Sequence, residues 1–210
     1  MNDILDLIKK NKIIAVIRME DPKKLLKVTE ALMKGGIKLL EITMTVPNAI
    51  DLIKKVSQNI SSDFIIGAGT VLDTETARAA ILAGAEFIVS PYTNYDVITL
   101  CKRYNKIVIP GAFTPTEIIK SWEVGADIVK IFPAKYVGPG YFKDIKGPYP
   151  QIDIMPTGGV LIDNSIDYIN AGACAVSIGG DLLPKKEIEK ENYQAIVKRA
   201  EKLLSILNKK

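Results

Sequence analysis

Short aliphatic runs alternate with amphipathic segments along the 210 residues, and this alternation limits the possible folds more than any other feature. The runs are rich in Ile and Val and nearly free of charge, which is typical of strands buried on both faces. The segments between them begin at N-cap residues or prolines and end at glycines, which is typical of helices. Alternating strands and helices pair their strands in parallel through right-handed crossovers. The sequence therefore predicts an α/β fold.

Eight runs are predicted to be strands. They are Ile13–Ile17, Leu39–Thr43, Phe64–Gly67, Phe87–Ser90, Ile107–Pro110, Ile128–Phe132, Ile154–Pro156 and Ala175–Ile178. A short N-terminal helix is expected before the first strand. Further helices are predicted between Asp21-Pro22 and Gly35-Gly36, from Pro47, near Asp73, Asn94, Pro115, Tyr141 and Asn164, and over Tyr193–Leu207.

Eight strand–helix units can form two architectures, an open doubly wound sheet or a closed (β/α)8 barrel. A Gly-Ala pair precedes the strands at Phe87, Ile128 and Ala175, so the chain looks like repeated pairs of units. Glu41 and Lys130 stand inside aliphatic strands, and polar side chains of this kind suit a barrel interior. The prediction is a single domain over residues 1–210, a (β/α)8 TIM barrel with a short N-terminal helix.

The chain contains no histidine, which excludes Ser-His-Asp and Cys-His nucleophiles and His-ligated zinc or haem. Acid–base chemistry must then use Asp, Glu, Lys, Tyr, a terminus or water. The net charge of +4 is dispersed, which argues against a nucleic-acid partner. Cys101 and Cys174 are expected to be buried free thiols in a reducing compartment. With no apolar run of membrane-spanning length and no leader pattern, we expect a cytoplasmic protein without a membrane partner.

Lys130 is the most unusual residue of the predicted strands. It alternates with Ile128 and Phe132, so the three side chains project on one face. Burial disfavours the ammonium, and a neutral amine is a nucleophile that forms Schiff bases with ketones. Glu41 has the equivalent place in the second strand. We favour a catalytic pair, Lys130 and Glu41, over a purely structural buried salt bridge.

The carboxyl ends of the strands should line the mouth of the barrel. They are rich in Gly, Thr and Pro, which bring backbone amides and small hydroxyls close to an anion. Gly67-Ala-Gly69 is not a dinucleotide fingerprint, because Leu72 replaces the third glycine. The Gly pairs after the last two strands are either tight turns or a phosphate site. The candidate substrate-binding residues are Arg18, Thr43, Thr45, Gly69, Thr70, Pro91, Phe132, Thr157, Gly158, Gly159, Gly179 and Gly180.

Seven segments together resemble one enzyme family. They are Ile14–Arg18, Leu40–Thr43, Gly67–Thr70, Phe87–Pro91, Ile109–Gly111, Val129–Ala134 and Pro156–Gly159. In this order and spacing they are similar to the bacterial 2-keto-3-deoxy-6-phosphogluconate (KDPG) aldolases, which overlap with the 4-hydroxy-2-oxoglutarate (KHG) aldolases. The similarity extends from the first predicted strand to the last.

This resemblance implies a class I aldolase on a (β/α)8 barrel, a homotrimer that needs no metal or organic cofactor and acts on a small 2-keto acid. It assigns the Schiff base to Lys130 and proton transfer to Glu41. Thr70 and Pro91 would line the pyruvate end, and Phe132 would pack over the imine. The distal part of the substrate would contact Thr157, Gly158, Gly159 and Gly180. Arg18 matches a basic residue at the end of the first strand and would help Thr70 and loop amides to bind the substrate carboxylate.

Two positions depart from the family pattern. Thr45 stands where many members have an arginine for the substrate carboxylate, and Asp181 stands where many have a serine at the phosphate. A carboxylate at position 181 repels a phosphate unless its side chain turns away. The expected reaction is cleavage of KDPG to pyruvate and glyceraldehyde 3-phosphate, with KHG as a further substrate. The alternatives are a phosphosugar isomerase or epimerase on the same barrel, and a non-catalytic trimeric scaffold.

Overall fold

The computed structural model describes residues 2–59 and 64–208, in which strands and helices alternate as predicted. The strands are β1 (Ile13–Ile17), β2 (Leu39–Thr43), β3 (Ile65–Gly69), β4 (Phe87–Val89), β5 (Ile107–Ile109), β6 (Gly111–Ala112), β7 (Val129–Ile131), β8 (Ile154–Pro156) and β9 (Val176–Ile178). The α-helices are α1 (Asn2–Asn11), α2 (Leu25–Lys34), α3 (Ala49–Asn59), α4 (Thr74–Leu82), α5 (Tyr95–Arg103), α6 (Pro115–Glu123), α7 (Gly138–Lys146), α8 (Ser165–Asn170), α9 (Lys185–Glu189) and α10 (Tyr193–Leu207). Two short 3-10 helices, η1 (Pro22–Lys24) and η2 (Ala134–Tyr136), follow β1 and β7.

The helix starts follow from local hydrogen bonds that the sequence encodes. The Asp73 carboxylate caps α4 by accepting from the Thr76 amide at 2.7 Å, and the Asn94 side chain caps α5. Thr114 and Glu117 form a capping box at α6, where Pro115 takes the first helical position. These caps satisfy amides that the first turn leaves unpaired. They confirm the starts predicted near Asp73, Asn94 and Pro115.

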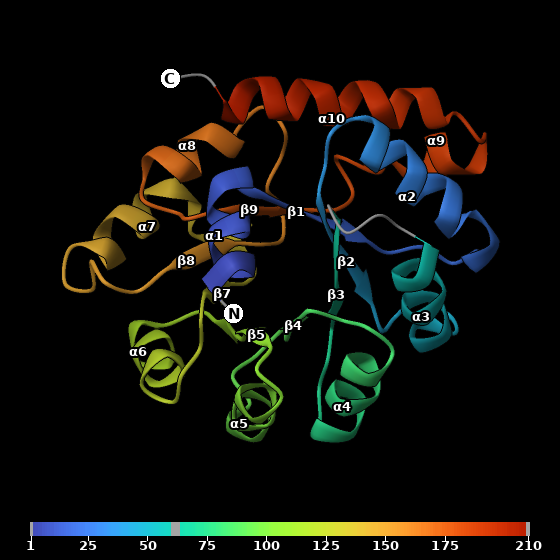
Figure 1. Cartoon of the computed structure of the whole chain (residues 1–210). Helices are drawn as coiled ribbons and strands as arrows, with labels where there is room; N and C mark the ends of the chain where they lie inside the picture. Colours follow the sequence, from blue (N-terminus) through green and yellow to red (C-terminus); the bar gives the residue numbers. More distant parts are fainter. Residues whose placement is uncertain (1, 60–63, 209–210) are drawn as a thin grey trace.

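All strand pairs are parallel, and they fall into two sheets. The larger sheet has the order β5-β4-β3-β2-β1-β9, and the smaller one has the order β6-β7-β8. A parallel bridge between Thr157 and Ser177 links β8 to β9. On the other side, the Lys130 amide donates to the Pro110 carbonyl at 2.8 Å, which links β7 to the end of β5. The result is a curled parallel sheet in two segments, covered by helices (Figure 1).

Several predicted element bounds were wrong. The strand predicted to end at Pro110 continues as the separate strand β6, because a proline without an N–H interrupts the ladder. The strand predicted at Phe64–Gly67 runs instead from Ile65 to Gly69. Helix α7 begins at Gly138 rather than near Tyr141, and α9 was not predicted at all.

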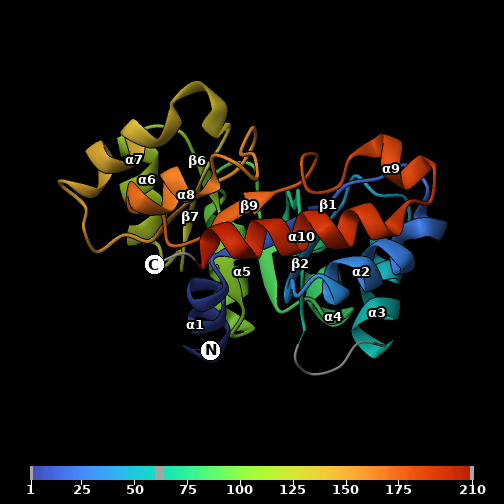
Figure 2. The same ribbon diagram turned by 90° about the horizontal axis from the view of Figure 1, so that it is seen from above.

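Hydrophobic side chains form two cores, one on each face of the curled sheet. The larger core lies between strands and helices, and includes Ala15, Ile42 and Val129. The smaller core lies on the inner face and includes Ile14, Leu39, Phe87, Ile128 and Met155. Helix α1 packs against this inner core through the fully buried Ile8. Figure 2 shows α1 at the side of the strands where the N-terminus lies.

Cys101 and Cys174 are free thiols, as predicted. Cys101 is buried, and Cys174 is partly exposed as a residue. Burial of the sulfur raises the pKa of each thiol to about 12, so both stay protonated and unreactive at neutral pH. None of the helices among the described residues is both long and apolar enough to span a bilayer.

Candidate active site

Lys130 is placed on the inner face of the sheet by the alternation of β7. Ile128 belongs to the inner core and Val129 to the outer one, so Lys130 points inward. The side chain is only 5% exposed, and its Nζ lies 5.0 Å from the centroid of the Phe132 ring. The strand therefore holds an amine in an apolar surrounding, as predicted from Ile128-Val-Lys-Ile-Phe132.

Glu41 reaches the same interior from β2. Leu39 is part of the inner core, so Glu41, two residues further on, shares its face. Glu41 is 1% exposed, and its Oε2 has no hydrogen-bond partner among the described residues. A Cβ at Gly69 would lie 1.8 Å from Glu41 Oε1, so only glycine at this position leaves room for the carboxyl group.

The two groups affect each other's charge without a direct ion pair in the part of the chain that the structure describes. Burial lowers the pKa of Lys130, against the attraction of Glu41, and the Arg18 charge lowers it further. Burial raises the pKa of Glu41, against the attraction of Lys130 and Arg18. Both shifts favour the uncharged forms. The interior thus favours a neutral amine facing a neutral carboxylic acid, which are the states that imine formation needs.

The residues predicted for the pyruvate end lie at the carboxyl ends of β3, β4 and β7. Thr70 follows β3 with a φ of 58°, a left-handed conformation that is uncommon outside glycine. The Pro91 carbonyl lies so close to Gly111 that a Cβ there would be 2.4 Å from it. Phe132 follows β7 and is partly exposed, directly after the buried Lys130 strand.

A cavity of about 580 Å³ opens at the mouth beside β1 and β2. Its lining includes Arg18, Met19, Thr45 and Leu183 together with residues of η1 and α9. Arg18 and Thr45 are exposed there, whereas Thr43 is fully buried and its hydroxyl contacts that of Thr45 at 2.7 Å. Lys130 and Glu41 do not line this cavity. The structure thus separates Arg18 and Thr45, at the rim, from the catalytic candidates below.

The predicted distal site lies on the loops after β8 and β9. Gly158 and Gly159 have φ of 86° and 84°, so both need glycine. Gly158 lies against Phe132, because a Cβ there would be 3.1 Å from the ring. Thr157 is buried, and its hydroxyl has no partner among the described residues. Gly179 is partly exposed and Gly180 is exposed with open space around it.

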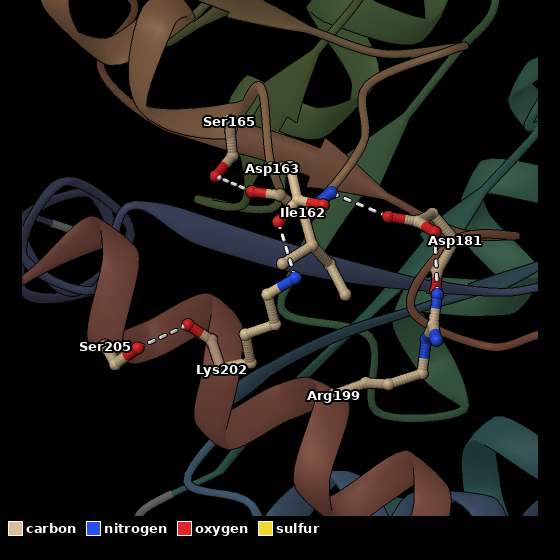
Figure 3. Close-up of polar contacts among 7 residues, drawn as sticks. All are labelled: Ile162, Asp163, Ser165, Asp181, Arg199, Lys202 and Ser205. Carbon is tan, nitrogen blue, oxygen red and sulfur yellow. Dashed lines mark hydrogen bonds and ion pairs between the residues drawn. The ribbon is translucent and has the colours of Figure 1, made fainter.

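Asp181 is the residue whose carboxylate was expected to repel a phosphate at this site unless its side chain turned away. Figure 3 shows its carboxylate between the Ile162 amide and Arg199 of α10. Asp181 Oδ2 accepts from the Ile162 amide and Oδ1 from the Arg199 Nη2, both at 2.7 Å. The Arg199 Nε also donates to the Asp181 carbonyl at 2.6 Å. The negative charge of Asp181 is therefore neutralised by Arg199, a residue that the sequence analysis missed.

No three His, Cys, Asp or Glu side chains gather into a metal-binding group within residues 2–59 and 64–208.

Residues 4–199 match the family model described as KDPG and KHG aldolase. The chain belongs to this family. The enzyme from Haemophilus influenzae named 2-dehydro-3-deoxy-phosphogluconate aldolase is 34% identical over 208 residues, with 97% of this chain and 96% of that protein covered. An Escherichia coli 2-dehydro-3-deoxy-6-phosphogalactonate aldolase is 33% identical over 171 residues, and the match covers 81% of this chain and 83% of that protein. This aldolase-family chain is therefore an enzyme of the lyase class.

One solved aldolase of the family bears directly on the chemistry. It is the Legionella pneumophila KDPG aldolase with pyruvate captured as a covalent carbinolamine. It superposes with a TM-score of 0.87 at 28% identity, over 94% of this chain and 96% of that one. The expected family is confirmed, and the isomerase and scaffold alternatives are set aside.

Proposed function

We propose that this aldolase cleaves KDPG to pyruvate and glyceraldehyde 3-phosphate through a Schiff base on Lys130. The observation that carries the proposal is the buried Lys130 amine, whose lowered pKa makes it a nucleophile inside the curled sheet. Glu41 on the inner face supplies a carboxyl group with a raised pKa, suited to giving and taking protons. The relatives named KDPG aldolase support the same substrate.

The reaction begins when the Lys130 Nζ lone pair adds to the C2 ketone, and the ketone oxygen takes up the proton that the nitrogen loses, which gives the carbinolamine. Protonated Glu41 then donates its proton to the new C2 hydroxyl, which leaves as water while the nitrogen forms the iminium. The Glu41 carboxylate next removes the C4 hydroxyl proton. The C3–C4 bonding electrons flow into the iminium, which releases the aldehyde and leaves an enamine. Protonation at C3 and hydrolysis of the imine return the free amine and pyruvate.

The remaining candidate residues bind the two ends of the substrate. Thr70, Pro91 and Phe132 surround the pyruvate end, with Thr43 and Gly69 beside Glu41 and Thr45 at the rim. Thr157, Gly158, Gly159, Gly179 and Gly180 bind the distal phosphate through one hydroxyl and loop amides, and Arg18 helps Thr70 to bind the substrate carboxylate. Neutralisation of Asp181 by Arg199 supports this role, because it removes the repulsion that an unpaired carboxylate would exert.

Two substrates are compatible with this site, and they differ at the distal end. A relative from Escherichia coli is named KHG/KDPG aldolase and is 30% identical over 190 residues, which supports KHG as a second substrate of this enzyme.

A cleavage assay with KDPG and its unphosphorylated analogue tests the proposed function. We expect kcat/KM to be at least about 100-fold higher for KDPG, since charge-assisted bonds to phosphate contribute roughly 1.5–3 kcal/mol each. Equal rates on the two compounds would remove the phosphate site from the proposal. If neither compound were cleaved, the result would contradict the aldolase activity itself.

The architecture proposed for residues 1–210 is a single (β/α)8 barrel, with the Thr157–Ser177 bridge and the Lys130–Pro110 hydrogen bond joining the two sheets. Stepping from Ile14 to the paired residue in each next strand, through both sheets, returns to β1 at a position eight residues before Ile14. This offset equals the shear number of (β/α)8 barrels.

We further propose a homotrimer, for which light scattering should give a mass of three chains. The two free thiols favour a reducing compartment, the cytoplasm.

A further inference from the structure

Ser177 is a buried hydroxyl that the mechanism above does not use. It lies in β9, is 2% exposed, and its Oγ has no hydrogen-bond partner among the described residues. A buried polar group without a partner costs about 1–3 kcal/mol, so such groups in a folded protein usually serve a purpose.

Ser177 faces the interior that contains Lys130. Ala175 belongs to the inner core and Val176 to the outer core, so Ser177 projects inward. It pairs with Ile14 of β1 on one side and with Thr157 on the other. The hydroxyl is therefore aimed into the site and not towards the helices.

The strand registers place Ser177 at the same height as the catalytic candidates. In a curled sheet with this shear, inward side chains at one height are displaced by one residue per strand. Lys130 pairs with Met155, and Met155 stands opposite Ala175, so the β9 residue level with Lys130 is Ser177.

The same count continues from β9 to β2. Ser177 pairs with Ile14, which stands opposite Leu39, so the β2 residue at this height is Glu41. Lys130, Ser177 and Glu41 thus belong to one layer of inward side chains, with Ser177 between the other two.

We propose that Ser177 positions the proton transfer between Glu41 and the substrate oxygen at C2. This role rests on the proposed Schiff-base function. The Ser177 Oγ accepts a hydrogen bond from protonated Glu41 and donates one to the carbinolamine hydroxyl. As that hydroxyl leaves as water it takes the Ser177 proton, and Ser177 recovers a proton from Glu41, so the serine is unchanged and Glu41 ends as a carboxylate. The unpaired Glu41 Oε2 and Ser177 Oγ both gain partners in this arrangement.

Ser177→Ala in the full chain tests the proposal. We expect kcat for KDPG to fall roughly tenfold with KM changed less than twofold. This is less than the roughly 100-fold or more that a full acid–base catalyst contributes, because Glu41 is still present. Exchange of the pyruvate methyl protons with deuterated water, which needs the imine but no aldehyde, should slow by the same factor. The pH dependence of kcat should also change, because Glu41 then transfers its proton without the serine. Ser177→Thr, which keeps the hydroxyl, should restore most of the rate.

Ser90→Ala is the matched control. Ser90 directly follows β4 and, like Ser177, is a buried serine, 1% exposed and without a partner among the described residues. Val89 before it belongs to the inner core, so Ser90 faces outward. Wild-type kcat, exchange rate and pH profile in Ser177→Ala would overturn the proposal. The proposal would also be overturned if Ser177→Ala and Ser90→Ala lost kcat equally and in proportion to the fall in their unfolding midpoints. Neither result bears on the Schiff base, because covalent trapping of pyruvate on the wild-type enzyme tests the Schiff base separately.

Discussion

Lys130 shows how one residue can serve function at the expense of stability. The amine sits in an apolar interior, 5% exposed, with no ion pair among the described residues to compensate its charge. Burial therefore favours loss of its proton on folding and lowers its pKa, whereas the unfolded chain keeps the ordinary pKa of 10.5. The proposed Schiff-base chemistry needs this neutral amine, and stability would be better served by an apolar side chain.

Lys130→Met is therefore expected to abolish cleavage and to stabilise the fold. Between the lowered native pKa of Lys130 and 10.5, the unfolded wild type binds more protons than the native state, so wild-type stability rises with pH in this window. The free energy of unfolding of the variant should exceed that of wild type by about 1–2 kcal/mol at pH 7, and the gain should shrink near pH 10. Urea titrations at both pH values measure it. Lys143→Met, at an exposed lysine, serves as the control, and a destabilised Lys130→Met would contradict this account.

Sequence alone identified the residues whose chemistry is unusual for their surroundings. Lys130 and Glu41 interrupt aliphatic strands, so alternation was enough to place both on one inner face. Ser177 escaped notice because a serine next to small residues in a strand is unremarkable. Its proposed role depends on the register of five strands, which no local pattern specifies.

At the scale of elements, α10 supports the loops that follow β8 and β9. Arg199 of α10 holds the Asp181 carboxylate, which in turn holds the Ile162 amide (Figure 3). Lys202, one turn further, pairs with Asp163 at 2.6 Å. The helix thereby ties together the two loops proposed to bind phosphate.

Arg199→Met should weaken binding of the phosphorylated substrate. Without the guanidinium, Asp181 presents an uncompensated charge to the phosphate, and we expect KM for KDPG to rise roughly tenfold, equivalent to about 1.4 kcal/mol, with kcat nearly unchanged. KM for the unphosphorylated analogue should not change. Steady-state kinetics on both substrates measures this difference. In the control Lys202→Met, an exposed ion pair on the same helix is lost and KM should be unaltered. A KM increase shared by both substrates would argue against the role given to Asp181.

Most elements could be predicted because each has its own local signal. Asp73, Asn94 and Thr114 cap helices through bonds to residues two or three positions away, so the sequence contains the whole interaction. Strand β6 has only two residues after a proline, too few for a pattern. The Asp181–Arg199 pair joins a loop to a helix 18 residues later, and only the folded chain reveals it.

At the scale of the whole molecule, the parallel strands gather side chains from distant parts of the sequence into one interior. The helices lie around the strands, and α1 lies against one end of the inner core (Figures 1 and 2). The cavity near Arg18 opens at the carboxyl ends of β1, β2 and β9. One end of the interior is thus packed for stability, and the other presents the candidate site.

Reduction with borohydride in the presence of pyruvate, followed by intact and peptide mass spectrometry, tests the central claim most directly. Wild-type enzyme should gain one reduced pyruvate adduct per chain, on the peptide that contains Lys130, and Lys130→Met should gain none. An adduct on another lysine, or wild-type cleavage of KDPG without any adduct, would contradict the Schiff-base assignment.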